Sequence, residues 1–221
     1  MEKKSYLDDA INRYPQLSNC REDILAAFHC MEESFLHGGK LLVMGNGGSS
    51  SDAEHFCAEL TKGVHLERQL HDDERKLFDG HNPMLPKMVQ SGLSALSLGV
   101  SHSFVTAYMN DVHPEFIFAQ QIWVHARAHD VVFSISTSGN SKNVIAGLSA
   151  AKVKGLKSIL LTGGKESACS VLADISIMVP ETEVHKIQEL HLPVYHALAF
   201  DLEHIFFNRE DGHHYRKFAR I

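Results

Sequence analysis

The chain alternates between short runs that are apolar from end to end and longer segments in which apolar residues recur at helical spacing. The clearest short runs are residues 40–45 (KLLVMG), 130–136 (DVVFSIS) and 157–162 (KSILLT). A strand buried on both faces of a parallel sheet shows no polar alternation, so each run predicts such a strand. Residues 174–180 add a fourth, and residues 93–98 (LSALSL) are a candidate fifth.

The longer segments predict helices between these strands. Residues 21–37 end at Gly38 and Gly39, a common way to end a helix. Pro193 lies inside the last helical segment and is expected to remove one backbone hydrogen bond and bend the helix. Another helix is expected to begin near Asp52. Further helices are expected at residues 101–111, 115–126, 142–155, 165–171 and 181–207.

Strands and helices that alternate in this way imply a parallel sheet covered on both faces. We therefore expect an α/β fold, a three-layer α/β/α sandwich, with additional N-terminal helices within residues 1–39. No tandem repeat or linker divides the chain, so residues 1–221 are expected to form a single domain.

Residues 62–92 interrupt the alternation. The segment is polar, contains prolines and has no clear period, and it is longer than an ordinary connection. We expect an inserted loop region that serves as a lid, an excursion into an interface or a mobile loop. Its charged stretch HDDERK is expected to form a solvated face.

Composition excludes several classes of partner. The net charge is -6 and Lys and Arg are scattered, so no basic run can follow a nucleic-acid backbone. No apolar run approaches the ~18 residues of a membrane span, and the N-terminal residues lack the apolar core of a signal peptide. The four cysteines form no CxxC pair, which is typical of free thiols in a reducing compartment. We expect a cytoplasmic protein with no nucleic-acid or membrane partner.

Two turns rich in glycine and serine follow two of the predicted strands. The first is Gly45–Ser51 (GNGGSSS), and the second lies in residues 134–143 (SISTSGNSKN). A turn that leads into a helix in this way presents unpaired N–H groups and the positive end of the helix dipole to a phosphate. The second turn adds four hydroxyl donors, Ser136, Thr137, Ser138 and Ser141.

The two turns favour a compact phosphoester over a nucleotide. Neither contains the Gly-Lys-Ser/Thr of a Walker A motif, and neither gives the full GxGxxG dinucleotide fingerprint. One such turn alone is explained equally well by Gly, Ser and Asn building tight turns and caps. Because parallel strands end at the same edge of a sheet, two such turns favour a ligand site at that edge.

Two pairs of polar residues share helix faces. His55 and Glu59 are four residues apart, and Gln188 and His196 are eight apart, a little over two turns. An i,i+4 pair of His and Glu is commonly a simple surface contact, although it also suits a shared ligand or metal. Cys57 points to the opposite side and is expected in the core, and His185 and His191 are expected to be surface or packing residues.

Three separated stretches, GNGGSSSDAEHFCAEL, ISTSGNSKNVI and IQELHLPVYH, resemble the phosphoheptose isomerase branch of the SIS (sugar isomerase) domain family. The resemblance extends from about Lys40 to Phe207. It implies a homotetramer with active sites between subunits and recognition of a sugar phosphate. Members of the family carry an arginine soon after the first helix of the motif, where this chain has Lys62 and Gly63, with Arg68 later.

The resemblance also implies roles for individual residues. His55, Glu59, Gln188 and His196 correspond to a zinc-binding set, with one Zn²⁺ per subunit, and these ligand types suit zinc. Glu59 and His196 correspond to the catalytic pair. Asn110 and Asp111 match an Asn-Asp step near the sugar hydroxyls, although a turn that ends a helix before Pro114 explains them equally well. The implied substrate-binding residues are Asn46, Gly47, Gly48, Ser49, Glu59, Asn110, Asp111, Ser136, Thr137, Ser138, Ser141 and Gln188.

The implied reaction converts sedoheptulose 7-phosphate to D-glycero-D-manno-heptose 7-phosphate through an enediol, at the entry to bacterial heptose synthesis. Such an isomerisation needs a base for the carbon proton and an acid for the oxygens, roles that fall to Glu59 and His196. Two alternatives of other classes remain. The first is a non-catalytic scaffold of the same fold that binds the replication initiator DnaA and lacks residues equivalent to Glu59 and His196. The second is a sugar-phosphate sensing module, which would keep the two phosphate-binding turns but would not need this acid-base pair.

Overall fold

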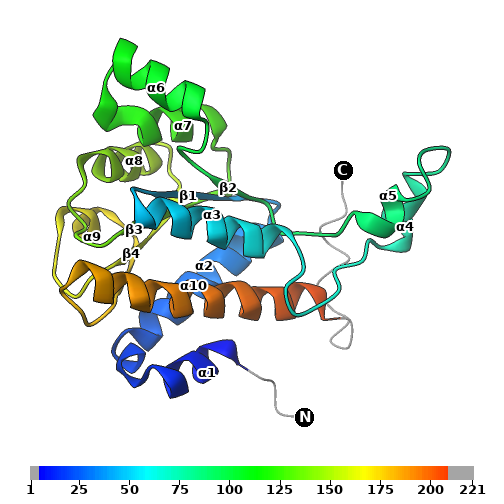
Figure 1. Ribbon diagram of the computed structural model, residues 1–221, viewed down its shortest axis with the longest axis horizontal. Coiled ribbons are helices and arrows are strands. Elements are labelled where there is room, and N and C mark those ends of the chain that lie inside the picture. Colours follow the sequence, from blue (N-terminus) through cyan, green and yellow to red (C-terminus); the bar gives the residue numbers. More distant parts are fainter. Residues whose placement is uncertain (1–4, 209–221) are drawn as a thin grey trace.

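The computed structural model describes residues 5–208 and contains a five-stranded parallel sheet (Figure 1). The spatial order of the strands is β2-β1-β3-β4-β5. All five predicted strands are present, as β1 (Leu41–Gly45), β2 (Ala95–Ser97), β3 (Val131–Ser136), β4 (Lys157–Thr162) and β5 (Ile175–Met178).

One face of the sheet is covered by the two ends of the chain and by the helix that follows β1. These helices are α1 (Tyr6–Arg13), α2 (Arg21–Leu36), α3 (Gly48–Thr61) and α10 (Val184–Phe207), with a 3-10 turn at Pro15–Cys20. They pack on Val43, Phe133 and Leu161, which point to this side of the strands. Asp201 on α10 accepts hydrogen bonds from the backbone N–H groups of Tyr6 and Leu7, which holds α1 in place.

The opposite face is covered by helices from the middle of the chain. These are α6 (His102–Asp111), α7 (Ile117–His125), α8 (Lys142–Val153) and α9 (Ala168–Leu172), with a 3-10 turn at Pro114–Phe116. Leu42, Val132 and Leu160 alternate with the residues of the first face and pack here. The inner strands β1, β3 and β4 are buried on both faces, as their continuous apolar runs indicated, whereas the edge strands β2 and β5 are only partly buried. The three-layer α/β/α prediction is confirmed.

The strand order brings the two glycine-rich turns together. β1 pairs with β3 in a register that runs from Leu41 opposite Val131 to Gly45 opposite Ile135. The turns after these neighbouring strands therefore leave the same edge of the sheet side by side.

Residues 69–90, which we call the arm, extend away from the sheet (Figure 1). The arm contains two short helices, α4 (Asp72–Lys76) and α5 (Leu85–Met88). Its two ends are joined by an antiparallel bridge between Gln69 and Gln90. Within the inserted region expected at residues 62–92, the HDDERK stretch forms α4, because its acidic residues in the first turn and basic residues in the last stabilise a helix. α4 buries no residue, so its charges are solvated as expected.

One helix begins earlier than predicted, and the last helix is continuous through its proline. α3 begins at Gly48, a turn earlier than Asp52, because Gly47 takes the backbone conformation that allows the helix to start directly after it. α10 continues as one helix through the buried Pro193. The predicted helix is therefore present without interruption, and the bend at Pro193 stays a prediction.

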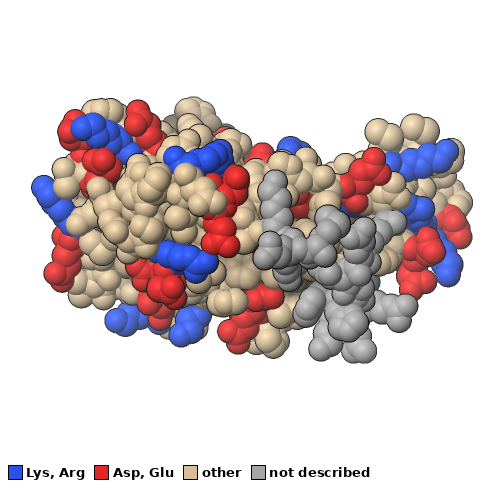
Figure 2. Space-filling view, turned by 90° about the horizontal axis from the view of Figure 1, so that it is seen from below, with Lys and Arg blue, Asp and Glu red and all other residues tan. Residues whose placement is uncertain are grey.

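The surface agrees with the charge analysis of the sequence. In the view of Figure 2 acidic and basic side chains are intermixed, with no continuous basic tract. Within residues 5–208, no helix combines the length and the apolar character that crossing a membrane requires.

Candidate active site

The first turn is shaped by glycines. Gly47 has φ 55° and ψ -122°, a conformation that side chains disfavour. A Cβ on Gly45 would overlap the backbone of Ser49, so the chain can turn this tightly only with glycine there. Asn46, Gly47 and Gly48 are exposed at the start of α3, whereas Ser49 is buried beneath them. The backbone at the start of α3 is thus open to a ligand.

The second turn is held by short polar contacts. The hydroxyl oxygens of Ser136 and Ser141 lie 3.5 Å apart, and the Asn140 N–H donates to the hydroxyl of Ser138. Ser138 is exposed, and Thr137 is partly so. These hydroxyls belong to the turn that leads from β3 into α8, and their binding of a phosphate stays a prediction.

A pair of amides that was not predicted joins the two turns. Asn46 and Asn143 each donate to the side-chain oxygen of the other, both at 2.8 Å. Asn143 lies in the first turn of α8 and is the last residue of the stretch 134–143 singled out in the sequence. The pair fixes the spacing of the two helix N-termini that would share one phosphate.

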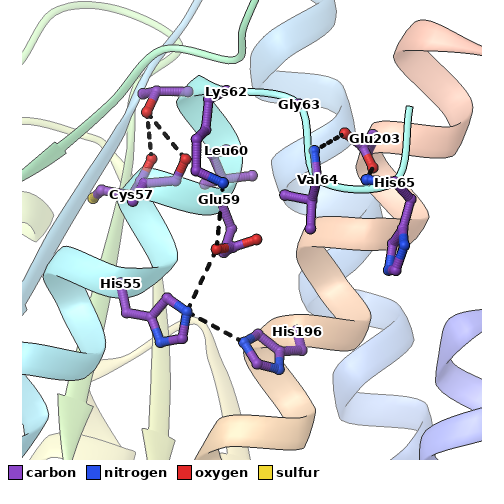
Figure 3. Close-up of polar contacts among 12 residues, drawn as sticks. His55, Cys57, Glu59, Leu60, Lys62, Gly63, Val64, His65, His196 and Glu203 are labelled. Carbon is purple, nitrogen blue, oxygen red and sulfur yellow. Dashed lines mark hydrogen bonds and ion pairs between the residues drawn. The ribbon is translucent and has the colours of Figure 1, made fainter. Parts of the chain in front are cut away.

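The predicted catalytic residues meet where α3 and α10 pack. His55 Nε2 lies 3.4 Å from Glu59 Oε1 and 3.5 Å from His196 Nε2. Figure 3 shows these two contacts as dashed lines that run from the His55 ring to the Glu59 carboxylate and to the His196 ring. Glu59 is 8% exposed, its Oε2 has no hydrogen-bond partner among residues 5–208, and the ammonium of Lys62 lies 3.8 Å from its Oε1. A buried carboxylate with a free oxygen is suited to accept a proton from a substrate.

Burial controls the chemistry of His196. Desolvation and the neighbouring His55 lower the pKa of His196, against the opposing charge of Glu59. The ring is therefore held neutral at neutral pH, and a neutral imidazole can both accept and donate a proton.

Two further polar residues border the cluster. The Tyr195 hydroxyl donates to Asp52 Oδ1 at 3.3 Å and lies 3.1 Å from His55 Nδ1. Burial raises the pKa of the Asp52 carboxyl and of the Tyr195 phenol. Sequence reasoning missed both, although Asp52 precedes His55 by three residues and so shares its helix face.

Gln188 lies at the other end of the same helix pair. Its amide packs against Gly48, with Nε2 2.5 Å from the position that a Cβ on Gly48 would occupy. Since His196 faces His55, both residues point toward α3, and the predicted shared face of α10 is confirmed. Gln188 thus approaches the first turn, whereas His196 approaches His55.

Asn110 and Asp111 lie elsewhere within one chain. They end α6, which packs on the opposite face of the sheet from α10 (Figure 1). Both are exposed, and the Asn110 amide donates to Asp111 at 2.8 Å. Their role at the sugar hydroxyls stays a prediction.

The donors of the cluster fit a zinc ion in part. A tetrahedral ion bound at ~2.0–2.1 Å holds its ligand atoms about 3.3 Å apart, close to the 3.4 and 3.5 Å that separate His55 Nε2 from its two neighbours. Glu59 Oε2 is also available. In the part of the chain that is described, however, no group of three or more His, Cys, Asp or Glu side chains converges as a metal centre. Two imidazoles and a carboxylate are present in suitable pairs, and a shared ion would draw them together.

Arg68, the first arginine after α3 in the sequence, is buried in a contact between α3 and α10. It is 2% exposed and its Nε donates to Glu203 at 2.8 Å. Its other nitrogens donate to the carbonyls of Glu59 and Leu60 at the end of α3. The Glu203 carboxylate also accepts the N–H groups of Val64 and His65 (Figure 3). Arg68 therefore fastens α3 to α10.

Comparison with known proteins places these features in a family. Residues 91–200 match the model of the SIS domain. A phosphoheptose isomerase of Helicobacter pylori strain Shi470 is 36% identical over 94% of this chain and 96% of its own length. A solved phosphoheptose isomerase from Neisseria gonorrhoeae is 30% identical, with a TM-score of 0.70 over 89% of this chain and 94% of that one.

The α/β sandwich with two glycine-rich turns at one sheet edge is thus an SIS domain. The chain belongs to the phosphoheptose isomerase family within that class. A second solved relative, a phosphoheptose isomerase from Francisella tularensis, is 28% identical, with the same TM-score of 0.70 over 90% of this chain and 94% of that one. The resemblance seen in the sequence is confirmed.

Proposed function

We propose that the protein is an aldose-ketose isomerase that converts sedoheptulose 7-phosphate to D-glycero-D-manno-heptose 7-phosphate for heptose precursor synthesis. The observation that carries the proposal is the meeting of Glu59 and His196 with His55 where α3 and α10 pack, on the helix that begins at the first glycine-rich turn. Relatives named phosphoheptose isomerase match almost the whole chain.

The substrate phosphate would bind between the two turns. The N-terminus of α3 and the hydroxyls of Ser136, Thr137, Ser138 and Ser141 supply donors there. Asn46, Gly47, Gly48 and Ser49 form the facing turn, and Gln188 reaches it from α10. Anchoring the phosphate in this way orients the reacting carbons.

The proton transfers fall to Glu59 and His196. Glu59 takes the proton from C1 of the ketose and delivers it to C2, so that a C1–H bond breaks and a C2–H bond forms through an enediol. The hydroxyl proton moves from O1 to O2 by way of the neutral imidazole of His196. His55, Glu59 and His196 would hold one Zn²⁺ per subunit, which would supply Lewis-acid polarisation of the carbonyl when bound. Gln188 stays a prediction as the fourth ligand, because its amide packs against Gly48 at the first turn.

We further propose a cytoplasmic homotetramer with its active sites between subunits. The position of Asn110 and Asp111 on the opposite face from α10 supports shared sites, because a second subunit would have to bring them to the sugar hydroxyls. Light scattering after size exclusion measures the number of subunits.

The experiment is NMR of sedoheptulose 7-phosphate in D₂O with purified, zinc-supplemented protein. We expect aldose formation, and we expect Glu59→Gln and His196→Asn each to abolish it while the circular dichroism spectrum stays that of the parent. Unchanged substrate with the parent protein would contradict the proposal. That outcome would favour the scaffold or sensing alternatives, which do not need the Glu and His pair.

A further inference from the structure

Two linked side chains, Tyr195 and Asp52, lie behind His55, at its Nδ1 and not at the Nε2 that faces Glu59. Tyr195 donates its hydroxyl hydrogen to Asp52 Oδ1 at 3.3 Å. The same hydroxyl oxygen lies 3.1 Å from His55 Nδ1. The Tyr195 ring is 1% exposed and packs against His55 and Phe56, so the hydroxyl is held in place.

Counting hydrogens fixes the direction of these hydrogen bonds. A phenol has one hydrogen to donate, and an ionised carboxylate can only accept. If the Tyr195 hydrogen points to Asp52, then the contact with His55 requires Nδ1 to carry a hydrogen and donate it to the phenol oxygen. A neutral imidazole protonated at Nδ1 has its lone pair at Nε2.

The lone pair would face the catalytic cluster. His55 Nε2 lies between Glu59 Oε1 and His196 Nε2, at 3.4 and 3.5 Å. A lone pair directed at a carboxylate oxygen is unfavourable unless an electropositive group lies between them. The orientation is therefore suited to an arriving cation.

We propose that Tyr195, oriented by Asp52, is a positioning residue that sets His55 in the Nδ1–H tautomer and so prepares Nε2 to bind a divalent metal ion. The inference rests on the proposed function in one respect, namely that His55 is a metal ligand. Hydrogen bonds that orient metal-bound histidines commonly change metal affinity by 10–100-fold.

The first test measures the tautomer directly in the metal-free protein. Long-range ¹H–¹⁵N NMR at pH 8.5, where imidazoles are neutral, distinguishes the two tautomers, and the loss of signals in His55→Asn assigns His55. We expect the Nδ1–H form in the parent. Tyr195→Phe keeps the ring and removes only the hydroxyl, and it should return His55 to the Nε2–H form that free imidazole side chains prefer. Asp52→Ala should do so as well, because Tyr195 is then free to donate to Nδ1.

The second test measures zinc affinity by competition with a chelator. Tyr195→Phe should bind zinc about 10–100-fold more weakly than the parent. Tyr108→Phe, the same chemical change on α6, is the matched control and should bind zinc as the parent does. Unfolding midpoints of the two variants show whether a change in fold accounts for any loss.

The outcomes separate this inference from the proposed function. An Nε2–H tautomer in the parent, or parental zinc affinity in Tyr195→Phe, overturns the inference whatever the activity. The protein could instead show the expected tautomer, and weaker zinc binding in Tyr195→Phe, while it leaves sedoheptulose 7-phosphate unchanged. That result would support the inference and contradict only the isomerase reaction.

Discussion

Replacing Glu203 by Ala should strongly destabilise the protein. Glu203 and Arg68 form an ion pair at 2.8 Å in which the side chains are 1% and 0% exposed. The substitution removes this carboxylate from the Arg68 guanidinium and the acceptor from the Val64 and His65 N–H groups. The buried cation would then lose this counter-charge, and water cannot replace it without opening the packing of α10 on residues 63–68.

The expected loss is about 3–5 kcal/mol in the free energy of unfolding, the usual effect of breaking a buried ion pair from one side. For a domain of this size the loss corresponds to a melting temperature about 6–20 °C lower. Arg68→Met combined with Glu203→Ala should recover part of the loss, because the buried cation is then removed together with its carboxylate. The Arg68 contacts with the carbonyls of Glu59 and Leu60 would still be missing.

Urea unfolding followed by circular dichroism, at one protein concentration for all variants, measures these differences. Glu203→Gln is a further control, since it keeps the size of the side chain and an acceptor oxygen. A loss below about 1 kcal/mol in Glu203→Ala, the range of exposed ion pairs, would refute the view that this contact fastens α3 to α10. If the double variant were less stable than Glu203→Ala, the loss in Glu203→Ala could not come from leaving the buried Arg68 cation without its carboxylate.

Three other changes test separate parts of the structure. Burial lowers the pKa of His191 to about 4, partly opposed by the Thr162 backbone. The contribution of the neutral His191 to the free energy of unfolding is therefore complete above pH 6.5 and should fall by about 3 kcal/mol toward pH 4. Unfolding of His191→Met, measured against pH, should lack this loss. Asn143→Asp puts a carboxylate between the two turns, so kinetics should show KM for the sugar phosphate raised about tenfold, or ~1.4 kcal/mol, with kcat little changed. Burial raises the pKa of the thiols of Cys20, Cys30 and Cys169 to about 11 and of Cys57 to about 12, so a thiol reagent at pH 8 should label them slowly until the protein is unfolded.

The layered fold could be predicted because its signals are local. Runs such as residues 130–136 are apolar on both sides of the strand, and among alternating helices this pattern is typical of a strand covered on both faces. The start of α3 could not be placed, since Gly, Ser and Asn fit a turn and a first helical turn equally well. The two helices of the arm could not be predicted, because helices of five and four residues are too short to show a period.

Contacts between site residues could be predicted where the residues share a helix, and they could not be predicted where the residues lie on different elements. His55 with Glu59, and Gln188 with His196, follow from spacing along one helix, and the family resemblance joined the two pairs. The contacts of Tyr195 with Asp52 and of Asn143 with Asn46 join elements that are about 100 residues or more apart in sequence. No spacing rule finds such pairs, because they depend on how α3, α8 and α10 pack.

The arm leaves the body of the protein and returns to it at one place, where Gln69 pairs with Gln90 and the Ser91 N–H donates to the Arg68 carbonyl at 2.8 Å. An excursion whose two ends touch could be shortened to a tight turn without moving the residues on either side of it. The length and sequence of the arm could therefore change during evolution, while the buried ion pair between Arg68 and Glu203 keeps α3 and α10 in place. Such a place is also a natural graft point, where a peptide or tag could replace the arm and leave the chemistry of the isomerase fold intact.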